Sequence, residues 1–596
     1  MAEPANSESG FSAQAVGSAV VQPYRELTIS AVLLGLIQGV ILNMAFVYAA
    51  LKLGFSIGGS TVAAIMGYAV LRGVLRKGTM VENNINQTIA SGINTAGTGI
   101  VFTVPALYLM NPDYIQPIPL MLAGLAGAVL GVVVIIPLRK QMIELDRLRF
   151  PSGVATSTII RAGSSGYQKA VLLSVGAGIS ALWKLIMASK VLETPEMVAQ
   201  TGFGIFHEEL HFGFGSIPDY FSPVVYLSLM NVAAGLLAGR GGLPFFAGGA
   251  LAWWVISPAA VNMGWIPAVE SASPSGFIYG QMLRPLGIGV LVGGALMGVV
   301  TSFPAIRSAL ASLATATKTA GAGKQIGGDE LKLPVLIFGT IAAVVLFFVA
   351  SWLSGATPLQ AGISAVVGTL WLGLAALIVA ESTGLTDISP MSGMALISVT
   401  IMMYLLNKNI AAAMVVGVAV SVAIGQGADM MQDLKTGHLV GSRPKKQQII
   451  QFGVAWLGAP VAIGTVFLLW SGGDGGVGGF GPGTDLTAPQ AGALQAILEG
   501  LGRGDVPLDK YAAGTALGGA LGLLPIGGVG VLVGLAMYLP FSITLGYGIG
   551  CLTSMGLVNR YGNRWYASSL VPVAAGFIVG EALMSLGITL VRLAGA

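Results

Sequence analysis

The chain has 596 residues, of which 54% are hydrophobic and only 9% are charged, with a net charge of +4. Soluble domains carry roughly 25% charged residues, so this composition excludes an ordinary soluble enzyme, a disordered chain and a nucleic-acid binder. A single cysteine, Cys551, also excludes a disulfide scaffold.

The apolar runs predict an all-α, polytopic transmembrane helical bundle of about sixteen spans. A transmembrane β-barrel is not expected, because the runs are continuous rather than alternating and are about 20 residues long. In chain order the predicted segments are 27–51, 56–75, 88–110, 117–138, 168–189, 220–240, 242–262, 284–305, 334–354, 358–380, 391–406, 408–427, 449–470, 511–526, 528–550 and 566–593. Two short segments, 391–406 and 511–526, predict broken or re-entrant helices.

Basic residues predict the orientation. Lysines and arginines gather after the second, fourth, eighth and twelfth segments, as in 139–149 and 435–446. The positive-inside rule therefore places both termini in the cytoplasm and the chain in the cell (inner) membrane as a multi-pass protein. Arg560 and Arg564 fall on the opposite side in this count. The first 24 residues have no basic start, so we expect no cleaved secretory signal.

A tandem repeat is predicted from two stretches 287 positions apart. PLGIGVLVGGALMG begins at Pro285, and PVAAGFIVGEALMS begins at Pro572. We therefore predict a polar tail at 1–24, a first membrane repeat of eight spans at 25–310, a cytoplasmic linker at 311–333 and a second repeat at 334–596. Duplicated halves with a site between them are usual in secondary transporters.

The repeat comparison singles out Glu581, because the matching position in the first half is Gly294. A carboxylate within a long apolar segment is costly unless it is protonated, paired or faces a cavity. Glu581 is therefore predicted to bind a proton or a substrate amine, and the alternative is a structural bond to a neighbouring helix.

Polar residues also precede and enter the third segment. The stretch ENNINQT contains Glu82 and four amides and runs into a span rich in glycine and threonine. Such a helix is suited to line a cavity, although Glu82 and Asn83 are alternatively explained as helix caps. We predict substrate contacts for Asn83, Asn84, Asn86, Gln87, Asn94 and Asn231; the isolated amides alternatively hold helices together.

Three further carboxylates are candidates for proton coupling, namely Glu82, Glu381 and Asp429. Asp429 and Asp433 are four positions apart and share a helix face, so they are expected either to relay protons or to hold a cation. A solvated helix end is the alternative. The chain has no GxxxxGK[ST] phosphate loop, which points to an ion gradient as the energy source. We expect no cofactor and no metal centre.

Several blocks resemble the oligopeptide transporter (OPT) superfamily. They are VENNINQTIASG at 81–92, LRFPSGVATSTII at 148–160, ADMMQDLKTGHLVGSRPKKQQI at 428–449 and LPFSITLGYGIG at 539–550, with GEAL at 580–583. The chain is most similar to the prokaryotic and yellow-stripe-like branch. This resemblance implies about sixteen spans, proton-coupled symport, and substrates that are small peptides or metal complexes of peptide-like chelators.

The sequence thus predicts a proton-coupled symporter that imports small oligopeptides or peptide-like metal chelates, and not an enzyme. The alternatives are a channel for small polar solutes and an exporter or antiporter of a peptide-like solute. Its expected partners are the substrate, protons and the lipid bilayer, with a homodimer as one assembly and no nucleic acid.

Overall fold

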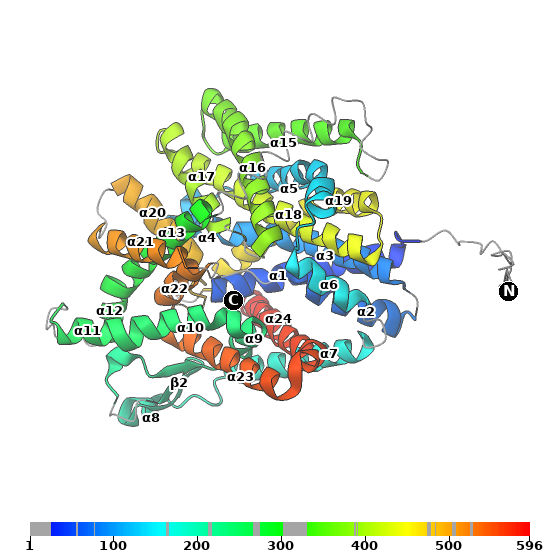
Figure 1. Cartoon of the computed structure of the whole chain (residues 1–596). Coiled ribbons are helices and arrows are strands. Elements are labelled where there is room, and N and C mark those ends of the chain that lie inside the picture. Colours follow the sequence, from blue (N-terminus) through cyan, green and yellow to red (C-terminus); the bar gives the residue numbers. More distant parts are fainter. Residues whose placement is uncertain are drawn as a thin grey trace, which may run out of the picture.

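A computed structural model shows a bundle of helices with one small sheet (Figure 1). It describes residues 25–54, 58–76, 78–161, 166–212, 217–265, 274–301, 330–386, 389, 391–473, 478–482, 484, 486–503, 508–524 and 528–595. The predicted tail at 1–24 and nearly all of the predicted linker at 311–333 lie outside these residues.

The elements of the first part of the chain are α1 (Ile29–Leu53), α2 (Gly59–Tyr68), α3 (Met80–Val101), α4 (Val104–Met110), α5 (Pro117–Ile135), α6 (Pro151–Arg161), α7 (Gly166–Ala188), α8 (Pro195–Thr201), β1 (Phe203–Phe206), β2 (Glu209–Phe212), β3 (Val224–Tyr226), α9 (Leu229–Ala238), α10 (Leu243–Ala250), α11 (Ser257–Asn262), α12 (Pro274–Ile278) and α13 (Arg284–Thr301). The later elements are α15 (Leu333–Leu353), α16 (Pro358–Thr386), α17 (Met391–Leu405), α18 (Ile410–Val440), α19 (Pro444–Ser471), α20 (Pro489–Arg503), α21 (Leu508–Gly522), α22 (Val529–Tyr538), α23 (Phe541–Trp565) and α24 (Val571–Gly595).

The membrane character of the bundle follows from the length of its helices. Within the described residues, eleven helices are long and apolar enough to cross a bilayer, and three shorter apolar helices lie at Gly59–Val74, Met394–Leu405 and Val529–Tyr538. The predicted helical membrane bundle is confirmed, whereas sixteen spans stays a prediction. Broken helices are present too: α9 ends at Gly239, whose φ is 51°, and α10 begins four residues later.

Local signals begin and end the long helices where the sequence supplies them. The hydroxyl of Thr28 accepts a hydrogen bond from Ala31 N at the start of α1, and Gly54 ends this helix with a φ of 79°. Asn409 caps α18 in the same way, and Gly441 ends it with a φ of 88°. Polar caps satisfy free N–H groups at helix starts, and glycine accepts the left-handed conformation at helix ends.

The centre of the bundle is formed by α3 and α18. The most apolar window of α18 is 89% buried and that of the span containing α3 is 83% buried, against 28% for α15. This explains how α3 tolerates its amides, because most of the helix is buried against other helices. The two helices lie next to each other in Figure 1, with α1 beside α3.

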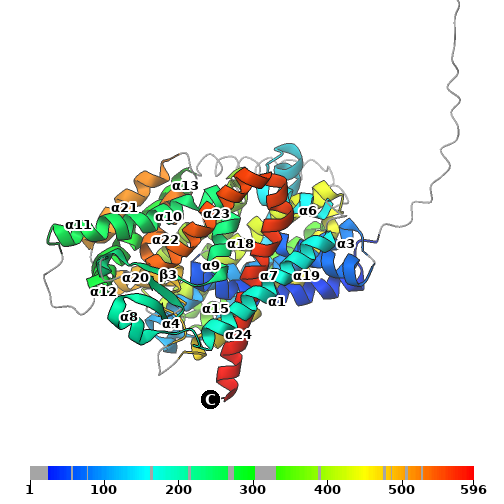
Figure 2. The ribbon, with the colours of Figure 1, turned by 90° about the horizontal axis from the view of Figure 1, so that it is seen from below.

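The two predicted halves interlock through their last helices. In the first half, α13 packs against α21 and α22; in the second, α24 packs against α7 and α9. A Cβ at Gly293 would overlap the backbone of α21, and a Cβ at Gly580 would overlap the backbone of α7. Small residues at such positions let helix backbones approach closely. The duplication itself stays a prediction. Figure 2 shows that the C-terminal end of α24 extends beyond the other helices.

A three-stranded antiparallel sheet, in the order β1-β2-β3, is the feature that the sequence did not predict. It occupies part of the stretch between α7 and α9, and β3 replaces the start of the segment predicted at 220–240. Phe206 pairs with Glu209, so His207 and Glu208 form the two-residue turn between β1 and β2. Both turn residues have positive φ, 49° and 62°, as this kind of tight hairpin turn requires.

Candidate functional site

Glu581 lies in the middle of α24 and is 1% exposed. Its Oε1 atom is 3.2 Å from Lys52 Nζ and accepts a hydrogen bond of 2.6 Å from the Ser228 hydroxyl. Its Oε2 atom accepts a bond of 2.8 Å from Met230 N. The carboxylate is therefore both paired with a cation and hydrogen-bonded, which is what its burial demands.

The start of α9 contributes to this environment. Ser228 is the N-cap residue of α9, and its hydroxyl also accepts a hydrogen bond from Asn231 N. Glu581 therefore lies at the N-terminal end of α9, where free backbone N–H groups and the helix dipole favour acidic side chains. The matching Gly294 lies against α22 instead, where a Cβ would be 2.5 Å from Gly530 C. The first half has no room for a side chain at this position.

Lys52 lies in the last turn of α1 and is 0% exposed. Besides Glu581, its ammonium group contacts the Tyr226 hydroxyl at 3.0 Å and lies 4.3 Å from the centre of the Tyr226 ring. The Tyr48 ring is 5.8 Å away. A fully buried lysine needs such partners to remain charged.

Tyr226 connects the buried Lys52 to Glu208 in the hairpin turn. Its hydroxyl donates to Glu208 Oε2 at 2.9 Å, and Lys184 Nζ donates to both Glu208 oxygens at 2.5 and 2.7 Å. Burial raises the pKa of Glu208, but the ammonium groups of Lys184 and Lys52 outweigh it and hold this pKa below its usual value. Glu581, Lys52, Tyr226, Glu208 and Lys184 form one continuous chain of contacts, the Lys52–Glu581 network.

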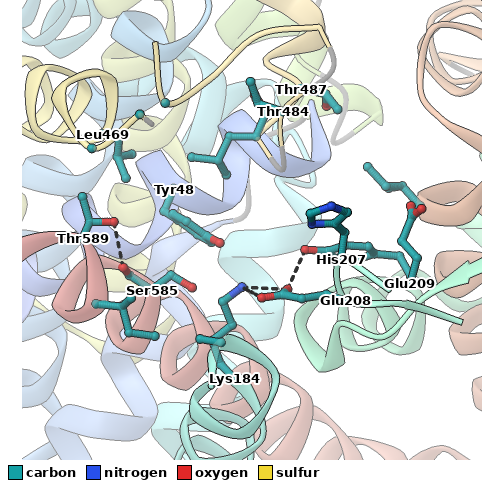
Figure 3. Close-up of a pocket in the computed structure, with 18 of the residues that line it drawn as sticks. Tyr48, Lys184, His207, Glu208, Glu209, Leu469, Thr484, Thr487, Ser585 and Thr589 are labelled. Atoms are coloured by element: carbon teal, nitrogen blue, oxygen red, sulfur yellow. Dashed lines mark hydrogen bonds and ion pairs between the residues drawn. The ribbon is translucent and has the colours of Figure 1, made fainter. Parts of the chain in front are cut away.

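A cavity of about 700 Å³ borders the outer end of this network. Lys184, Glu208 and Tyr226 line it together with His207 and Glu209, and Arg592 of α24 lies at the same cavity. Figure 3 shows Lys184 and Glu208 pointing toward each other beside Tyr48, with Ser585 and Thr589 of α24 on another wall. The cavity thus presents cationic, anionic and neutral polar groups to a solute.

The predicted substrate-binding amides of α3 hold helices together in this structure. Asn83 Nδ2 donates to Ala64 O, Asn84 Nδ2 to the Ser442 hydroxyl, Asn86 Nδ2 to Gln38 Oε1 and Gln87 Nε2 to Asp433 Oδ1. Asn231 Nδ2 likewise donates to Ile543 O. These contacts match the alternative that amides join helices, and substrate contact stays a prediction for all five residues.

Asn94 is placed differently, because it borders a second cavity, of about 190 Å³. Asp429 lines the same cavity, together with Thr95 and Thr98. This cavity is bordered by α2, α3, α6, α17 and α18, and the Lys52–Glu581 network does not line it. Two of the predicted residues therefore meet at a cavity that is separate from the larger one.

The other two predicted carboxylates have different surroundings. Glu82 forms a capping box with Thr79: Glu82 N donates to the Thr79 hydroxyl, and Thr79 N donates to Glu82 Oε2 at 2.6 Å. Together these two hydrogen bonds satisfy free N–H groups at the start of α3. Glu381 lies within α16, but its side chain is outside the described part of the chain.

Sequence reasoning identified Glu581 and missed its partners. Lys52 could have been identified from the sequence, because it is a charged residue in the last turn of an apolar span. Lys184 gave the same kind of signal, because it lies within the apolar segment predicted at 168–189, whereas Tyr226 and Glu208 gave none. Their roles depend on the sheet and on helices far apart in the chain.

Comparison with known proteins bears on the class of this membrane protein. A sequence model of the family described as OPT oligopeptide transporter protein matches residues 26–592. The chain belongs to the OPT family. Members of the OPT family are transporters and not enzymes, so the family resemblance and the prediction of a transporter are confirmed, whereas proton coupling and symport stay predictions.

Curated relatives carry two kinds of name. A putative oligopeptide transporter of Haemophilus influenzae is 27% identical, and the match covers 90% of this chain and 91% of that protein. The probable metal-nicotianamine transporter YSL17 of Oryza sativa subsp. japonica is 25% identical over 78% of this chain and 72% of that protein. Metal-nicotianamine transporter YSL2 of Arabidopsis thaliana is 24% identical, with coverages of 78% and 74%.

Proposed function

We propose that this OPT family protein is a proton-coupled symporter that imports small oligopeptides or peptide-like metal chelates. The observation that carries the proposal is the buried Lys52–Glu581 ion pair, which is joined through Tyr226 to the Glu208–Lys184 pair at the cavity wall. One end of this network reaches the cavity and the other ends on a carboxylate inside the bundle. It can therefore link solute binding to protonation.

The charged side chains that line the cavity are suited to bind a zwitterionic substrate. A substrate carboxylate would pair with Lys184 and a substrate amino group with Glu208, since both side chains line the cavity. Peptides and amino-carboxylate chelators both carry these groups, so one site can serve either class. The relatives' names, which include oligopeptides and metal-nicotianamine complexes, support the same range.

Proton uptake follows from the charge balance of the network. In this structure Lys52 supplies the cation that pairs with Glu581. A substrate amino group on Glu208 would displace the Tyr226 hydroxyl from this carboxylate, and Lys52, which contacts Tyr226, would leave Glu581 with it. Glu581 would then be a buried carboxylate without a cation, and such a group takes up a proton. Substrate and proton would therefore be carried together.

The proposal includes the orientation predicted from the basic loops, with both termini cytoplasmic in the inner membrane. Import would occur by alternating access between two halves, as in other duplicated carriers. A channel is less suited to this arrangement, because the ion pairs link α1, α7, α24 and the hairpin turn across the molecule. A homodimer remains compatible with the proposal and is not required by it.

Uptake into proteoliposomes tests the proposed function. With the full chain reconstituted, an inward proton gradient should drive a labelled dipeptide or metal-nicotianamine complex above its external concentration. A protonophore should abolish the accumulation without abolishing exchange. Uptake that only equilibrates, with no effect of the protonophore, would contradict the proposal and favour a channel.

A further inference from the structure

A second pair of carboxyl groups, one buried and one half-buried, lies on α18 outside the Lys52–Glu581 network. Asp433 is 0% exposed, and Asp429 lies one helical turn earlier, at the wall of the 190 Å³ cavity. We propose that these two residues share one proton through the hydroxyl groups of Ser91 and Ser60, and so form a proton-binding site separate from Glu581.

The four side chains are joined end to end. Ser91 Oγ lies 2.5 Å from Asp429 Oδ2, Ser91 Oγ lies 2.7 Å from Ser60 Oγ, and Ser60 Oγ lies 3.3 Å from Asp433 Oδ1. Ser60 belongs to α2 and Ser91 to α3, so three helices supply the connection. The two distances that involve Ser91 are those of short O–H···O hydrogen bonds, and the bond from Ser60 to Asp433 is longer and weaker.

When both carboxyl groups are ionised, the four linked side chains have one hydrogen too few for their three contacts. Each serine hydroxyl has a single hydrogen to donate, and a carboxylate has none. Two hydroxyls can therefore complete only two of these three contacts. If both serines donate to carboxylates, their two oxygens face each other without a hydrogen between them. A proton on either carboxyl group supplies the missing hydrogen.

The unsatisfied atoms around the pair indicate the same deficit. Asp433 Oδ2 has no hydrogen-bond partner although it is buried, and neither has Gln87 Oε1. Gln87 Nε2 donates to Asp433 Oδ1 at 2.7 Å, which places this amide directly beside the carboxyl group. Buried acceptors without donors are costly, so the site favours an added positive charge or proton.

The charged groups of the surrounding helices do not neutralise the pair. Within the described residues, no lysine, arginine or histidine forms an ion pair with either carboxyl group. Lys435 and His438 follow later on α18, and on α6 the Arg161 guanidinium donates to Leu439 O. The side chains from α2 and α3 that contact the two carboxyl groups are hydroxyl and amide groups, namely Ser60, Ser91 and Gln87. Gln447 of α19 donates to the backbone carbonyl of Asp433. On α16, the side chain of Glu381 lies outside the described part. Two ionised carboxylates one helical turn apart repel each other, and this repulsion favours the retention of one proton by the pair.

Reversal of the hydroxyl groups moves this proton between the two ends. With the proton on Asp433, Asp433 donates to Ser60, Ser60 to Ser91 and Ser91 to Asp429. With the proton on Asp429 the three bonds run the other way. No bond other than O–H is broken or formed, and the net charge of the pair stays at −1. Since Asp429 borders the cavity, the proton exchanges with water there. A coupling role rests on the proposed function, whereas proton binding itself does not.

Infrared spectroscopy of the full chain in lipid nanodiscs tests the inference without measuring transport. At neutral pH the protein should show the C=O stretching band of a protonated carboxyl group, shifted by exchange into D₂O. The double variant Asp429→Asn/Asp433→Asn should lose this band, and Glu196→Gln, at an exposed position of α8, should keep it. Each single Asn variant should also lose the band, because the repulsion that retains the proton is gone.

Absence of the band from the unsubstituted protein would overturn the inference, as would its persistence in the double variant. If the double variant does not fold, loss of the band in Asp429→Asn supports the site and its persistence in both single variants contradicts it. A protein that shows the band but does not accumulate substrate against a gradient would contradict the proposed symport and leave this site standing.

Discussion

Lys52 and Glu581 are 529 positions apart in the chain, yet their charged groups lie 3.2 Å apart and each side chain is 1% exposed. The pair joins α1 to α24 at the point where α9 begins. Removal of one partner from a buried ion pair costs about 3–5 kcal/mol, because the other charge is left without compensation.

Substitution of one partner should therefore be far more damaging than substitution of both. We expect Lys52→Met to lower the free energy of unfolding by about 3–5 kcal/mol. The double variant Lys52→Met/Glu581→Gln should recover most of this loss, since no buried charge remains. Chemical denaturation in detergent micelles measures the difference. Equal losses in the single and double variants would show that the two charges do not interact.

Tyr226 should act as the bridge of the network. Tyr226→Phe removes the hydroxyl that contacts Lys52 and Glu208 but leaves both ion pairs in place. We expect a folded protein, destabilised by about 1–3 kcal/mol, whose substrate binding no longer drives proton uptake. The ratio of protons to substrate taken up measures coupling. Tyr561→Phe, at an exposed tyrosine, is the matched control and should leave this ratio unchanged.

Lys184 should distinguish substrates by their carboxylate. Lys184→Met is expected to weaken binding of a dipeptide with a free C-terminus by about 10-fold or more, while a C-terminal amide loses little, because charged hydrogen bonds are worth roughly 1.5–3 kcal/mol. Lys190→Met, an exposed position after α7, serves as the control. Competition binding with both peptides gives the answer. A similar loss of affinity for the free dipeptide and for its C-terminal amide would argue against a contact between Lys184 and the substrate carboxylate.

The Glu208–Lys184 pair should persist at mildly acidic pH. The pKa of Glu208 is lowered from 4.5, so the stabilisation it provides is fully present above pH 4.5 and is lost as pH falls through the lowered value. Glu208 is accordingly not expected to titrate between about pH 5 and pH 7, so any pH dependence of substrate binding in this range should be the same in the unsubstituted protein and in Glu208→Gln. Titration calorimetry at several pH values measures this. A pH dependence that disappears in Glu208→Gln would show instead that Glu208 itself titrates in this range.

Close packing of α24 on α7 predicts a steric effect. Gly580 lies against the backbone of α7, so Gly580→Leu should force the helices apart and lower the melting temperature markedly. A Cβ added at Gly587 would meet no atom within 4 Å, and Gly587→Ala should be neutral. Thermal unfolding of the purified variants separates the two cases.

The sequence predicts the membrane bundle because hydrophobic runs are a local property. It also identifies Glu581, since a carboxylate stands out in an apolar stretch whatever surrounds it. It does not predict that Lys52 neutralises this carboxylate, because the two lie at opposite ends of the chain. The amides of α3 show the same limit. Their type predicts a polar environment, but only the neighbouring helices decide whether that environment is a helix contact, as for Asn83, or a cavity, as for Asn94.

The coupling role of Glu581 is tested most directly with one preparation of Glu581→Gln in proteoliposomes. Two rates of substrate uptake are measured: accumulation driven by a proton gradient, and exchange of labelled for unlabelled substrate at equal pH. If Glu581 couples proton and substrate movement, accumulation should be lost while exchange continues. Accumulation equal to that of the unsubstituted protein would contradict this role of Glu581.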